Sequence, residues 1–383
     1  MASAMSSYEL IYFDQAATSY PKSQAVKESV LRSLTTGVGN PGRSAHKEAK
    51  DAAEAVYEAR CAVCRFFGAT DESRVVFTQN ATTALNMAIH AICASGGHVL
   101  CSDIEHNAVL RPLAYLAREG KIRFDIFPSR GITADLLERY VRADTCAIVT
   151  THASNVCGRV LPLEIIGDFC RKRSILFIVD ASQSAGHLPI DVQRMKIDIL
   201  CAPAHKGLYG ILGAGFAIFE TQRELPPLLH GGSGTESFSP YMPKALPERF
   251  EAGSLSVPAI TALGTSLKEI EAVGVKTIAA HIASIEKYLR QELASFPALS
   301  LSKESGCGIL SLTHERFSPS RMADALDEVG VATRAGYHCA PLAHKTLGTD
   351  KTGSLRLSLG ATNTKAECAA FCERFSAVLK KLS

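Results

Sequence analysis

Short apolar runs alternate with amphipathic stretches along the first 219 residues of the chain. The short runs are rich in Val, Ile and Phe, which is typical of strands buried on both faces of a parallel sheet. We expect strands at 75–78, 98–102, 123–127, 147–151, 176–180, 199–202 and 215–219. The longer stretches carry apolar residues at helical spacing and predict helices at 23–35, 45–67, 82–94, 109–119 and 163–172. This alternation predicts an α/β fold with a mostly parallel seven-stranded sheet between helices.

The pattern changes after residue 219. Residues 225–256 are rich in Pro, Gly and Ser and follow neither a strand nor a helix period. An irregular segment of this length is usually functional. Helices are expected again at 258–273 and 275–295, followed by a smaller α+β unit. The predicted domains are a large one over 14–256 and a small one made of 1–13 and 257–383.

Composition narrows the possible functions. The 383 residues allow two domains, and a net charge of +3 gives no reason to expect nucleic acid or an anionic membrane as a partner. No apolar run reaches the ~20 residues of a membrane span, and the first residues lack the basic and apolar regions of a signal peptide. Twelve cysteines in a chain without an export signal are expected to be reduced thiols, so the predicted location is the cytoplasm.

Cys61 and Cys64 form the one C-x-x-C pair of the sequence. The pair lies inside the expected helix 45–67, and no second pair accompanies it. A metal or redox role is therefore not expected here, and no metal is assigned to the chain. Most other cysteines sit singly in apolar runs, where a cysteine acts as a small hydrophobe.

Polar side chains gather at the predicted carboxyl ends of the strands. Asp180 ends one strand, and Lys206 follows the next one. In a parallel sheet these ends lie at one edge, where cofactors bind. A lysine and an aspartate there suit pyridoxal 5'-phosphate (PLP), because the lysine can form a Schiff base and the aspartate can pair with the pyridinium nitrogen. The alternative is that Asp180 caps a helix and Lys206 is a solvated surface residue.

Other strand ends supply weaker candidates. Thr82 opens a helix, where backbone N–H groups and a hydroxyl make a phosphate site. His106 also opens a helix and could stack on a pyridine ring and shuttle protons. Asn155 and Gln183 could hydrogen-bond the phenolic oxygen of PLP. Taken singly, each of these residues is better explained as a helix cap or an ordinary polar loop residue.

Two residues near the C-terminus add further chemistry. Cys339 lies in a loop punctuated by Gly and Pro, beside basic and imidazole side chains, which are conditions that favour an exposed thiolate. Arg356 lies among apolar residues in a predicted strand, where a guanidinium usually binds a carboxylate, here plausibly that of an amino acid. The alternatives are a buried loop cysteine and an internal salt bridge.

Seven ordered motifs together resemble the cysteine desulfurase and selenocysteine lyase family, which are class V aminotransferases of PLP fold-type I. The resemblance covers almost the whole chain. The motifs are Phe13-Asp-Gln-Ala-Ala-Thr-Ser-Tyr-Pro-Lys22, Gly39-Asn-Pro-Gly-Arg-Ser-Ala-His46, Ser154-Asn-Val-Cys-Gly158, Val179-Asp-Ala-Ser-Gln-Ser-Ala-Gly186, Ala204-His-Lys206, Arg249-Phe-Glu-Ala-Gly-Ser254 and Arg334-Ala-Gly-Tyr-His-Cys339.

The resemblance implies a role for each site residue. Catalysis would rest on Lys206, Cys339 and His106. The expected cofactor ligands are Thr82, His106, Asn155, Asp180, Gln183, His205, Lys206 and Ser254. Ser254 would reach the phosphate of a second subunit, which implies a homodimer with shared active sites. The expected substrate ligands are Ala16, Asn155 and Arg356.

The sequence departs from the family pattern at two places. The family often has a serine three residues before the lysine, where this chain has Pro203. The cysteine loop carries Tyr337 where relatives often have His or Trp, and the residues after Cys339 differ from the best-known branch. These departures bear on phosphate binding and on the sulfur acceptor.

The function implied is conversion of L-cysteine to L-alanine, with the sulfur left on Cys339 as a persulfide for an acceptor protein or thiol. Selenocysteine would fit the same residues, which keeps selenocysteine lyase as an alternative. A class V aminotransferase or another PLP lyase would keep Lys206 and Asp180 but have no use for Cys339. A PLP-binding scaffold without turnover is the alternative outside the enzymes.

Overall fold

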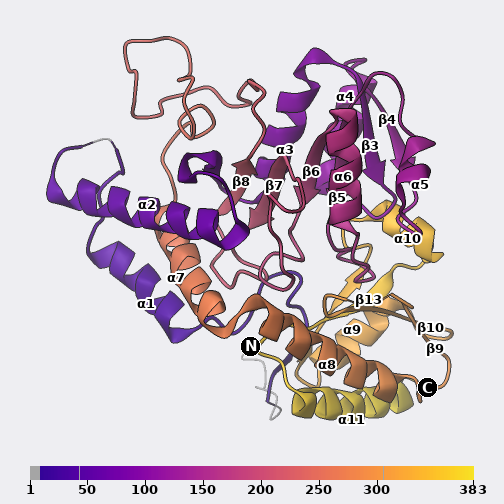
Figure 1. The fold of residues 1–383 in the computed structure, drawn as a ribbon. Helices are drawn as coiled ribbons and strands as arrows, with labels where there is room; N and C mark the ends of the chain where they lie inside the picture. The colour runs from indigo at the N-terminus through magenta and orange to yellow at the C-terminus, as the bar shows by residue number, and fades with distance from the viewer. Residues whose placement is uncertain (1–8, 43, 305) are drawn as a thin grey trace.

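The structure, a computed structural model, describes residues 9–42, 44–304 and 306–383. Arg43 of the second motif and residues 1–8 of the predicted small domain lie outside the described residues. A seven-stranded sheet forms the centre of the molecule, in the order β2-β8-β7-β6-β5-β3-β4 (Figure 1). In chain order its strands are β2 (Val75–Thr78), β3 (His98–Ser102), β4 (Arg123–Phe127), β5 (Thr145–Thr151), β6 (Leu176–Asp180), β7 (Ile199–Pro203) and β8 (Gly215–Phe219).

This sheet is parallel except for β8, which runs antiparallel to both of its neighbours. Most of its strands are buried along their whole length, which explains their continuous apolar sequences. On one face, α3 (Ala81–Ile92) and α4 (Asn107–Arg118) pack into a common apolar core. On the other face lie α2 (Lys47–Phe67), α6 (Leu163–Arg173) and α7 (Val257–Val273).

A second, four-stranded sheet lies in the C-terminal part, in the antiparallel order β12-β13-β10-β9. Its strands are β9 (Leu299–Leu301), β10 (Ile309–His314), β12 (Arg334–Gly336) and β13 (Ser354–Ser358). Three helices share an apolar core with it: α8 (Val275–Leu293), α9 (Pro319–Asp327) and α11 (Lys365–Leu382). The N-terminal strand β1 (Ile11–Tyr12) pairs in parallel with β11 (Val331–Ala332), beside this unit.

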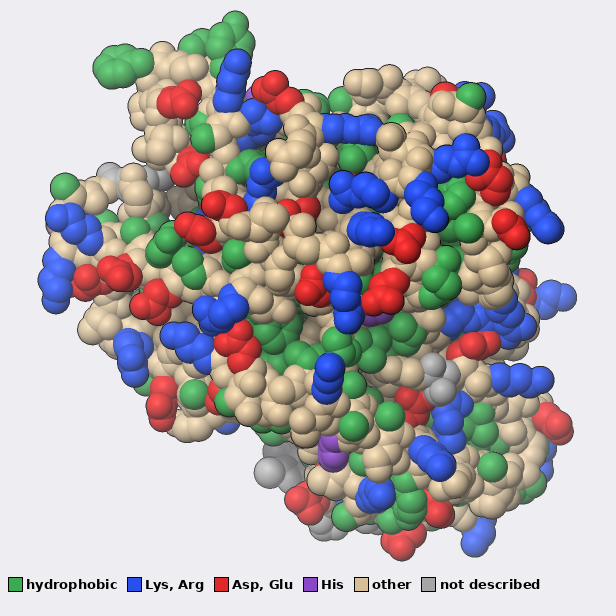
Figure 2. All heavy atoms as spheres, viewed as in Figure 1, with side chains coloured by type: hydrophobic (Ala, Val, Ile, Leu, Met, Phe, Trp, Pro, Cys, Tyr) green, Lys and Arg blue, Asp and Glu red, His purple; other side chains and the backbone are tan. Residues whose placement is uncertain are grey.

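Three further helices pack around these layers. They are α1 (Gln24–Thr35), α5 (Ala134–Glu138) and α10 (Pro341–Leu347). The segment 225–256 contains no helix or strand among its described residues, and it projects from the body at the upper left of Figure 1. Hydrophobic side chains stand out on that projection in Figure 2, whereas acidic and basic side chains are mixed over the rest of this face.

The predicted fold class is confirmed: a mostly parallel seven-stranded sheet between helices, plus a smaller α+β unit. The predicted strands and helices differ from the observed ones by a few residues at their ends, because terminal turns carry weak sequence signals. The division into domains at residues 13 and 256 stays a prediction. Within the described ranges, no helix combines the length and the apolar character that crossing a bilayer requires.

Candidate active site

The polar side chains expected at the strand ends line one pocket. It opens at the carboxyl ends of β5, β6 and β7 and at the first turns of α3 and α4. Such a position is the usual ligand site of an open parallel sheet. The pocket is lined by Thr82, His106, Asn155, Asp180, Gln183, His205 and Lys206, with Ser182 and Pro203 among their neighbours.

Lys206 lies in the turn that follows β7, and its amine faces this pocket. Burial lowers the pKa of the amine to about 8, although the nearby Asp180 carboxylate acts in the opposite direction. No hydrogen bond or ion pair of its Nζ atom occurs among the described residues. A buried amine with a lowered pKa is poised to act as a base or nucleophile near neutral pH.

Asp180 is the last residue of β6, and only 2% of it is exposed. One carboxylate oxygen, Oδ1, accepts the backbone N–H of Ser182 at 2.9 Å. This bond orients the carboxylate at the end of its strand, in the same pocket as Lys206. The pair can therefore hold a proton on a ring nitrogen and present an amine to the same ligand.

The start of α3 forms another wall of the pocket. Asn80 caps the helix by accepting the N–H of Thr83 at 2.9 Å, so the helix N-terminus points into the pocket at Ala81 and Thr82. Helix N-termini favour phosphate, because their N–H groups are unpaired and the dipole is positive there. His205 adds a buried imidazole whose Nδ1 atom has no partner among the described residues, and burial lowers its pKa to about 4.

His106 lies across the pocket as the N-cap of α4. Its Nδ1 atom accepts the N–H of Ala108 at 3.0 Å, which fixes the ring. Burial lowers its pKa to about 4, so the imidazole is neutral near pH 7. A neutral ring in this place can lie against a planar ligand and accept a proton on its remaining nitrogen.

Glu105, the residue before His106, is fully buried. Its two carboxylate oxygens accept the N–H of Thr151 at 2.8 and 3.0 Å, and the hydroxyl of Ser102 donates to one of them. Burial raises its pKa to about 8, and the negative charge of Asp180 acts in the same direction. Glu105 thereby ties the turn that carries His106 to the end of β5.

Asn155 and Gln183 reach the pocket, but their amides are already bonded to backbone oxygens. Asn155 donates to the carbonyl of His338 at 2.6 Å, and Gln183 donates to the carbonyl of Ala16 at 3.1 Å. The amides therefore join the pocket to the cysteine loop on one side and to the N-terminal segment on the other.

Cys339 lies at the mouth of the pocket, on the loop before α10, and its side chain is exposed. Its carbonyl accepts the N–H of Asn107 at 2.7 Å, beside His106. His338 and Cys339 both have positive φ angles, 48° and 57°, which residues with side chains rarely adopt. A surface groove holds Cys339 together with His106 and Thr82, which also line the pocket around Lys206.

Arg356 lies in β13 and is 1% exposed. Its guanidinium pairs with Asp14 at 2.8 Å and donates to the carbonyl of Asn155 at 3.1 Å. Its Nε atom has no partner among the described residues. The internal salt bridge considered above is thus present, and Arg356 is not among the residues that line the pocket around Lys206. Ala16 lies nearby, held through its N–H by the hydroxyl of Ser358.

Ser254 does not reach this pocket. It is exposed, accepts a hydrogen bond from Asn40 at 3.0 Å and lies at the base of the projecting segment. A separate hollow beside it is lined by Asn40, Tyr57, Arg60 and Glu251.

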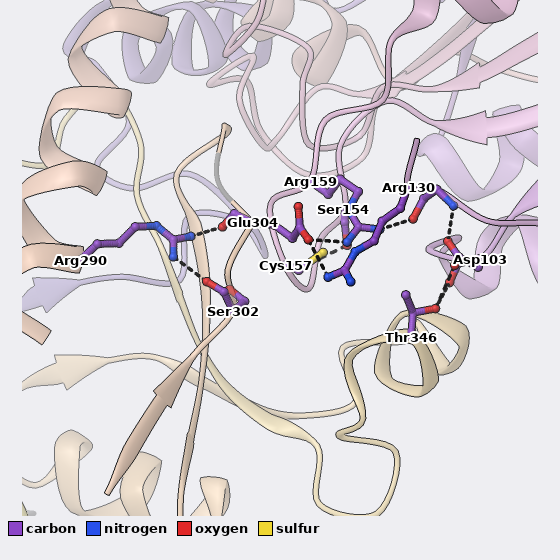
Figure 3. Close-up of polar contacts among 10 residues, drawn as sticks. Asp103, Arg130, Ser154, Cys157, Arg159, Arg290, Ser302, Glu304 and Thr346 are labelled. Carbon is purple, nitrogen blue, oxygen red and sulfur yellow. Dashed lines mark hydrogen bonds and ion pairs between the residues drawn. The ribbon is translucent and has the colours of Figure 1, made fainter. Parts of the chain in front are cut away.

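Polar contacts fix the loop that carries Asn155 (Figure 3). Arg159 donates to the hydroxyl of Ser129 and pairs with Glu304. Arg130 pairs with the same carboxylate at 2.9 Å, and Arg290 donates to the carbonyls of Ser302 and Glu304. Because Glu304 belongs to the four-stranded unit, these contacts couple the Asn155 loop to both sheets.

Figure 3 also shows how α10, the helix that follows the cysteine loop, is attached through Thr346. The carboxylate of Asp103 accepts the N–H of Ser129 at 2.9 Å and the hydroxyl of Thr346 at 3.1 Å. Asp103 follows β3 and lies three residues before His106. The helix after Cys339 is therefore bonded to the same turn that presents His106.

The residues present fit PLP. The buried amine, the strand-end carboxylate and a helix N-terminus share one pocket, and the buried His205 Nδ1 lacks a partner there. This donor set matches an aldehyde, a pyridine nitrogen and a phosphate. Pro203 lines the pocket where the family often has a serine. Thr82 and Ser182, which carry hydroxyls, line the same pocket.

Sequence reasoning missed three contributors to this site: Asp14, Glu105 and the N–H of Asn107. Asp14 and Glu105 stood within or beside recognisable motifs, but nothing in the motifs said which side chains they would meet. The N–H of Asn107 carries no sequence signal, since every residue except proline has one.

Comparisons with known proteins identify the family of the chain. The family model "Aminotransferase class-V" matches residues 11–371. A probable cysteine desulfurase of Methanothermobacter thermautotrophicus is 30% identical over 93% of this chain and 92% of its own length. The cysteine desulfurase IscS of Shewanella sediminis is 30% identical over 93% of this chain and 89% of its own.

Solved structures of cysteine desulfurases share the fold of this chain. The cysteine desulfurase CsdA of Escherichia coli has a TM-score of 0.88 and 26% identity, covering 97% of this chain and 95% of its own. The apo structure of the Thermococcus onnurineus cysteine desulfurase has a TM-score of 0.90 at 24% identity and covers all of both chains, which shows a shared fold.

Proposed function

This chain belongs to the class V aminotransferase family, and from that premise we propose that it is a PLP-dependent cysteine desulfurase. It converts L-cysteine to L-alanine and keeps the sulfur as a persulfide on Cys339. The observation that carries the proposal is that an exposed thiol, on Cys339, shares a groove with His106 at the mouth of the pocket that holds Lys206 and Asp180. An aminotransferase would need no thiol there.

When bound, PLP supplies an aldehyde that links to amines and a ring that stores the electrons left by a removed proton. Lys206 would hold the aldehyde carbon, and Asp180 would keep the proton on the ring nitrogen. The first turn of α3, with Thr82, and His205 would hold the phosphate. Asn155 and Gln183 would orient the phenolic edge, and His106 would lie against the ring.

The substrate carboxylate would bind Arg356 through the Nε–H that lacks a partner. The salt bridge with Asp14 fixes the guanidinium, so the arginine loses little side-chain entropy when the substrate arrives. Ala16 would line the same end of the site. Burial of this region excludes water and strengthens the charged contact.

Lys206 would move the proton of the substrate α-carbon. Its lowered pKa supplies the neutral amine near pH 8, as a general base requires. The contacts on either side of Lys206 would hold its backbone in place while the side chain moves between cofactor and substrate. His106, which is neutral, would carry the proton at the sulfur end of the site.

Cys339 would accept the sulfur. Its thiolate attacks the sulfur of the substrate, the carbon–sulfur bond breaks and a sulfur–sulfur bond forms. The carbon keeps the electron pair and takes a proton, so that a CH₂ group becomes the methyl group of alanine. The enzyme keeps Cys–S–SH, and no external oxidant or reductant is required. An acceptor protein or a small thiol would then remove the outer sulfur from the exposed loop.

We also propose a homodimer in which Ser254 contributes to the pocket of the partner subunit. Support comes from the projecting segment 225–256, where Phe238 and Tyr241 are 107% and 81% exposed. Large apolar side chains on a projection usually mark an interface. A reducing compartment, the cytoplasm, suits a chain whose twelve cysteines are all free thiols.

The direct test is to supply PLP and L-cysteine to the purified protein and to measure alanine and protein-bound persulfide together. We expect alanine to form and Cys339 to gain one sulfur, detected by mass spectrometry of the alkylated peptide. Alanine without persulfide would favour another PLP lyase, and amino transfer to a keto acid without alanine would favour an aminotransferase. L-selenocysteine as an alternative substrate tests the lyase assignment.

A further inference from the structure

One stretch of the chain, residues 14–22, spans the candidate site from end to end. At one end Asp14 pairs with Arg356, where the substrate carboxylate is expected. At the other end Lys22 lies beside the turn that carries Lys206. Lys22 is the last residue of the motif Phe13–Lys22, and the proposed function assigns it no role.

The carbonyl oxygen of His205, the residue before Lys206, collects an unusual set of donors. It accepts the backbone N–H of Ser19 at 2.9 Å and the hydroxyls of Thr18 and Ser19 at 3.1 Å each. The ammonium of Lys22 donates to the same oxygen at 3.2 Å. A carbonyl has two lone pairs, so this oxygen has more donors than it normally accepts.

Lys22 is held by these neutral oxygens rather than by a carboxylate. Its ammonium also donates to the hydroxyl of Ser19 at 2.6 Å, and it makes no ion pair within the described part of the chain. Burial lowers its pKa to about 8. Removing a charge from water without an opposite charge is costly, so the contacts with Ser19 and His205 must offset that cost.

The backbone is equally constrained on the other side of Lys206. A Cβ atom on Gly207 would overlap the carbonyl oxygen of Ala185 and would lie 2.9 Å from the ring of His187. The peptides before and after Lys206 are therefore both fixed, one by the donors of residues 18–22 and the other by close packing. Only the side chain of Lys206 is left to move.

We propose that Lys22 is a positioning residue for Lys206. It anchors the segment 14–22 to the carbonyl of His205 and thereby fixes the peptide from which the Lys206 side chain reaches both cofactor and substrate. Lys22 lines neither the pocket nor the groove, so it acts through the backbone and not by touching substrate. This inference rests on the function proposed for Lys206.

Hydrogen–deuterium exchange of the protein as purified with PLP tests the anchor. In Lys22→Met, the backbone amides of residues 204–210 should exchange at least about tenfold faster than in the wild type, because a charge-assisted hydrogen bond to that turn is lost. The matched control is Lys27→Met, an exposed lysine of α1, which should leave that exchange unchanged. Equal exchange in Lys22→Met and the wild type would overturn the proposal.

Steady-state kinetics test whether loss of the Lys22 anchor slows turnover. Lys22→Met should lower kcat about tenfold and leave KM for L-cysteine within about twofold, since Asp14 and Ser358 hold the substrate end independently. Lys22→Arg, which keeps a charged donor, should restore most of kcat. A rise in KM without a fall in kcat, or a loss that arginine does not reverse, would overturn the role of Lys22.

The two proposals fail in different ways. Full activity of Lys206→Ala would refute the proposed function, whatever the exchange experiment gives. Unchanged exchange in Lys22→Met, with Lys206 still essential, would refute only the positioning role.

Discussion

The two nucleophiles of the site, Lys206 and Cys339, occupy opposite environments. Lys206 is half-buried in the turn that follows β7 of the large sheet, and desolvation of its amine lowers the pKa. Cys339 is exposed on a loop with left-handed backbone angles. Hydrogen bonds from Asn155 and Asn107 to backbone carbonyls hold that loop in place. In the proposed mechanism the amine needs a dry pocket to act as a base, whereas the thiol must be reached by the acceptor of its sulfur.

The contacts that hold the backbone in place differ between Lys206 and Cys339. The backbone of the half-buried Lys206 is fixed on one side by hydrogen bonds to the His205 carbonyl and on the other by the lack of space at Gly207. The exposed Cys339 is fixed by polar contacts at backbone atoms, from Asn107 and Asn155, which leave the side chain accessible. Substitutions at the two residues and at the groups that hold them should therefore differ in the size of their effects.

Replacement of the buried nucleophile should have the largest effect. Lys206→Ala should lower alanine formation at least about 10⁴-fold, since one amine both holds the cofactor and moves the proton. PLP should still bind through the phosphate end of the pocket, as gel filtration and absorbance would show. In the wild type, borohydride should fix the cofactor onto Lys206, as seen by peptide mapping. Lys172→Ala, on the exposed side of α6, is the control and should keep full activity.

Replacement of the exposed nucleophile should have the next largest effect. Cys339→Ser should lower alanine formation at least about 100-fold while PLP binding stays unchanged, because the steps before carbon–sulfur cleavage need only Lys206. Persulfide should disappear from the protein. Cys61→Ser, in α2, should behave like the wild type. A Cys339→Ser enzyme with near-normal turnover would make this thiol a bystander.

Arg356→Lys tests whether the buried guanidinium binds the substrate carboxylate. A lysine keeps the charge but loses the planar fork and the Nε–H, so we expect KM for L-cysteine to rise roughly tenfold to a hundredfold. Because the residue is buried, thermal unfolding should be measured beside the kinetics. A fall in kcat with unchanged KM, in a folded variant, would argue that Arg356 is a structural ion pair and not a substrate ligand.

The buried carboxyl of Glu105 gives the pocket a pH dependence of stability. Its pKa is raised to about 8 when folded, so the folded state holds more protons than the unfolded state between about pH 4.5 and 8. Its contribution to stability is present at low pH and is lost as pH rises through 8.

Glu105→Gln removes this titration. Relative to the wild type, the free energy of unfolding of the variant should improve by roughly 1 kcal/mol per pH unit between pH 5 and 8. Urea titrations at pH 5, 6, 7 and 8 measure it. Glu373→Gln, on the exposed side of α11, should run parallel to the wild type. Parallel curves for Glu105→Gln would mean that this carboxyl titrates normally.

The smallest effect should come from the hydrogen bond that attaches α10, the helix after Cys339, to Asp103. Thr346→Val removes the hydrogen bond to Asp103 and should loosen α10 below the cysteine loop. The loss of one such bond is worth about 1 kcal/mol, so turnover should fall no more than about fivefold. Alkylation of Cys339 by iodoacetamide should change rate by a similar factor. Thr352→Val, in the neighbouring turn, is the control, since its hydroxyl donates to the carbonyl of the adjacent Gly353.

The comparison also separates what the sequence could predict from what it could not. Lys206, Asp180 and His106 were predictable as neighbours, because the carboxyl ends of parallel strands lie at one edge of a sheet. The contacts of Arg356 with Asp14, of Asn107 with Cys339 and of Arg159 with Glu304 were not. They join segments far apart in the chain, and a single sequence carries no signal for which long-range pairs will form.

Asp14 and Arg356 lie 342 positions apart in the sequence, and strands β1 and β11 bring the same two ends of the chain together. During synthesis on the ribosome, the large sheet can complete its strands while the C-terminal unit is still being translated. The pair of Asp14 and Arg356, where we propose that the substrate binds, can form only after nearly the whole polypeptide has emerged. A nascent chain could therefore hold the cofactor end of its site before it can bind an amino acid, which makes substrate capture the last property the protein acquires.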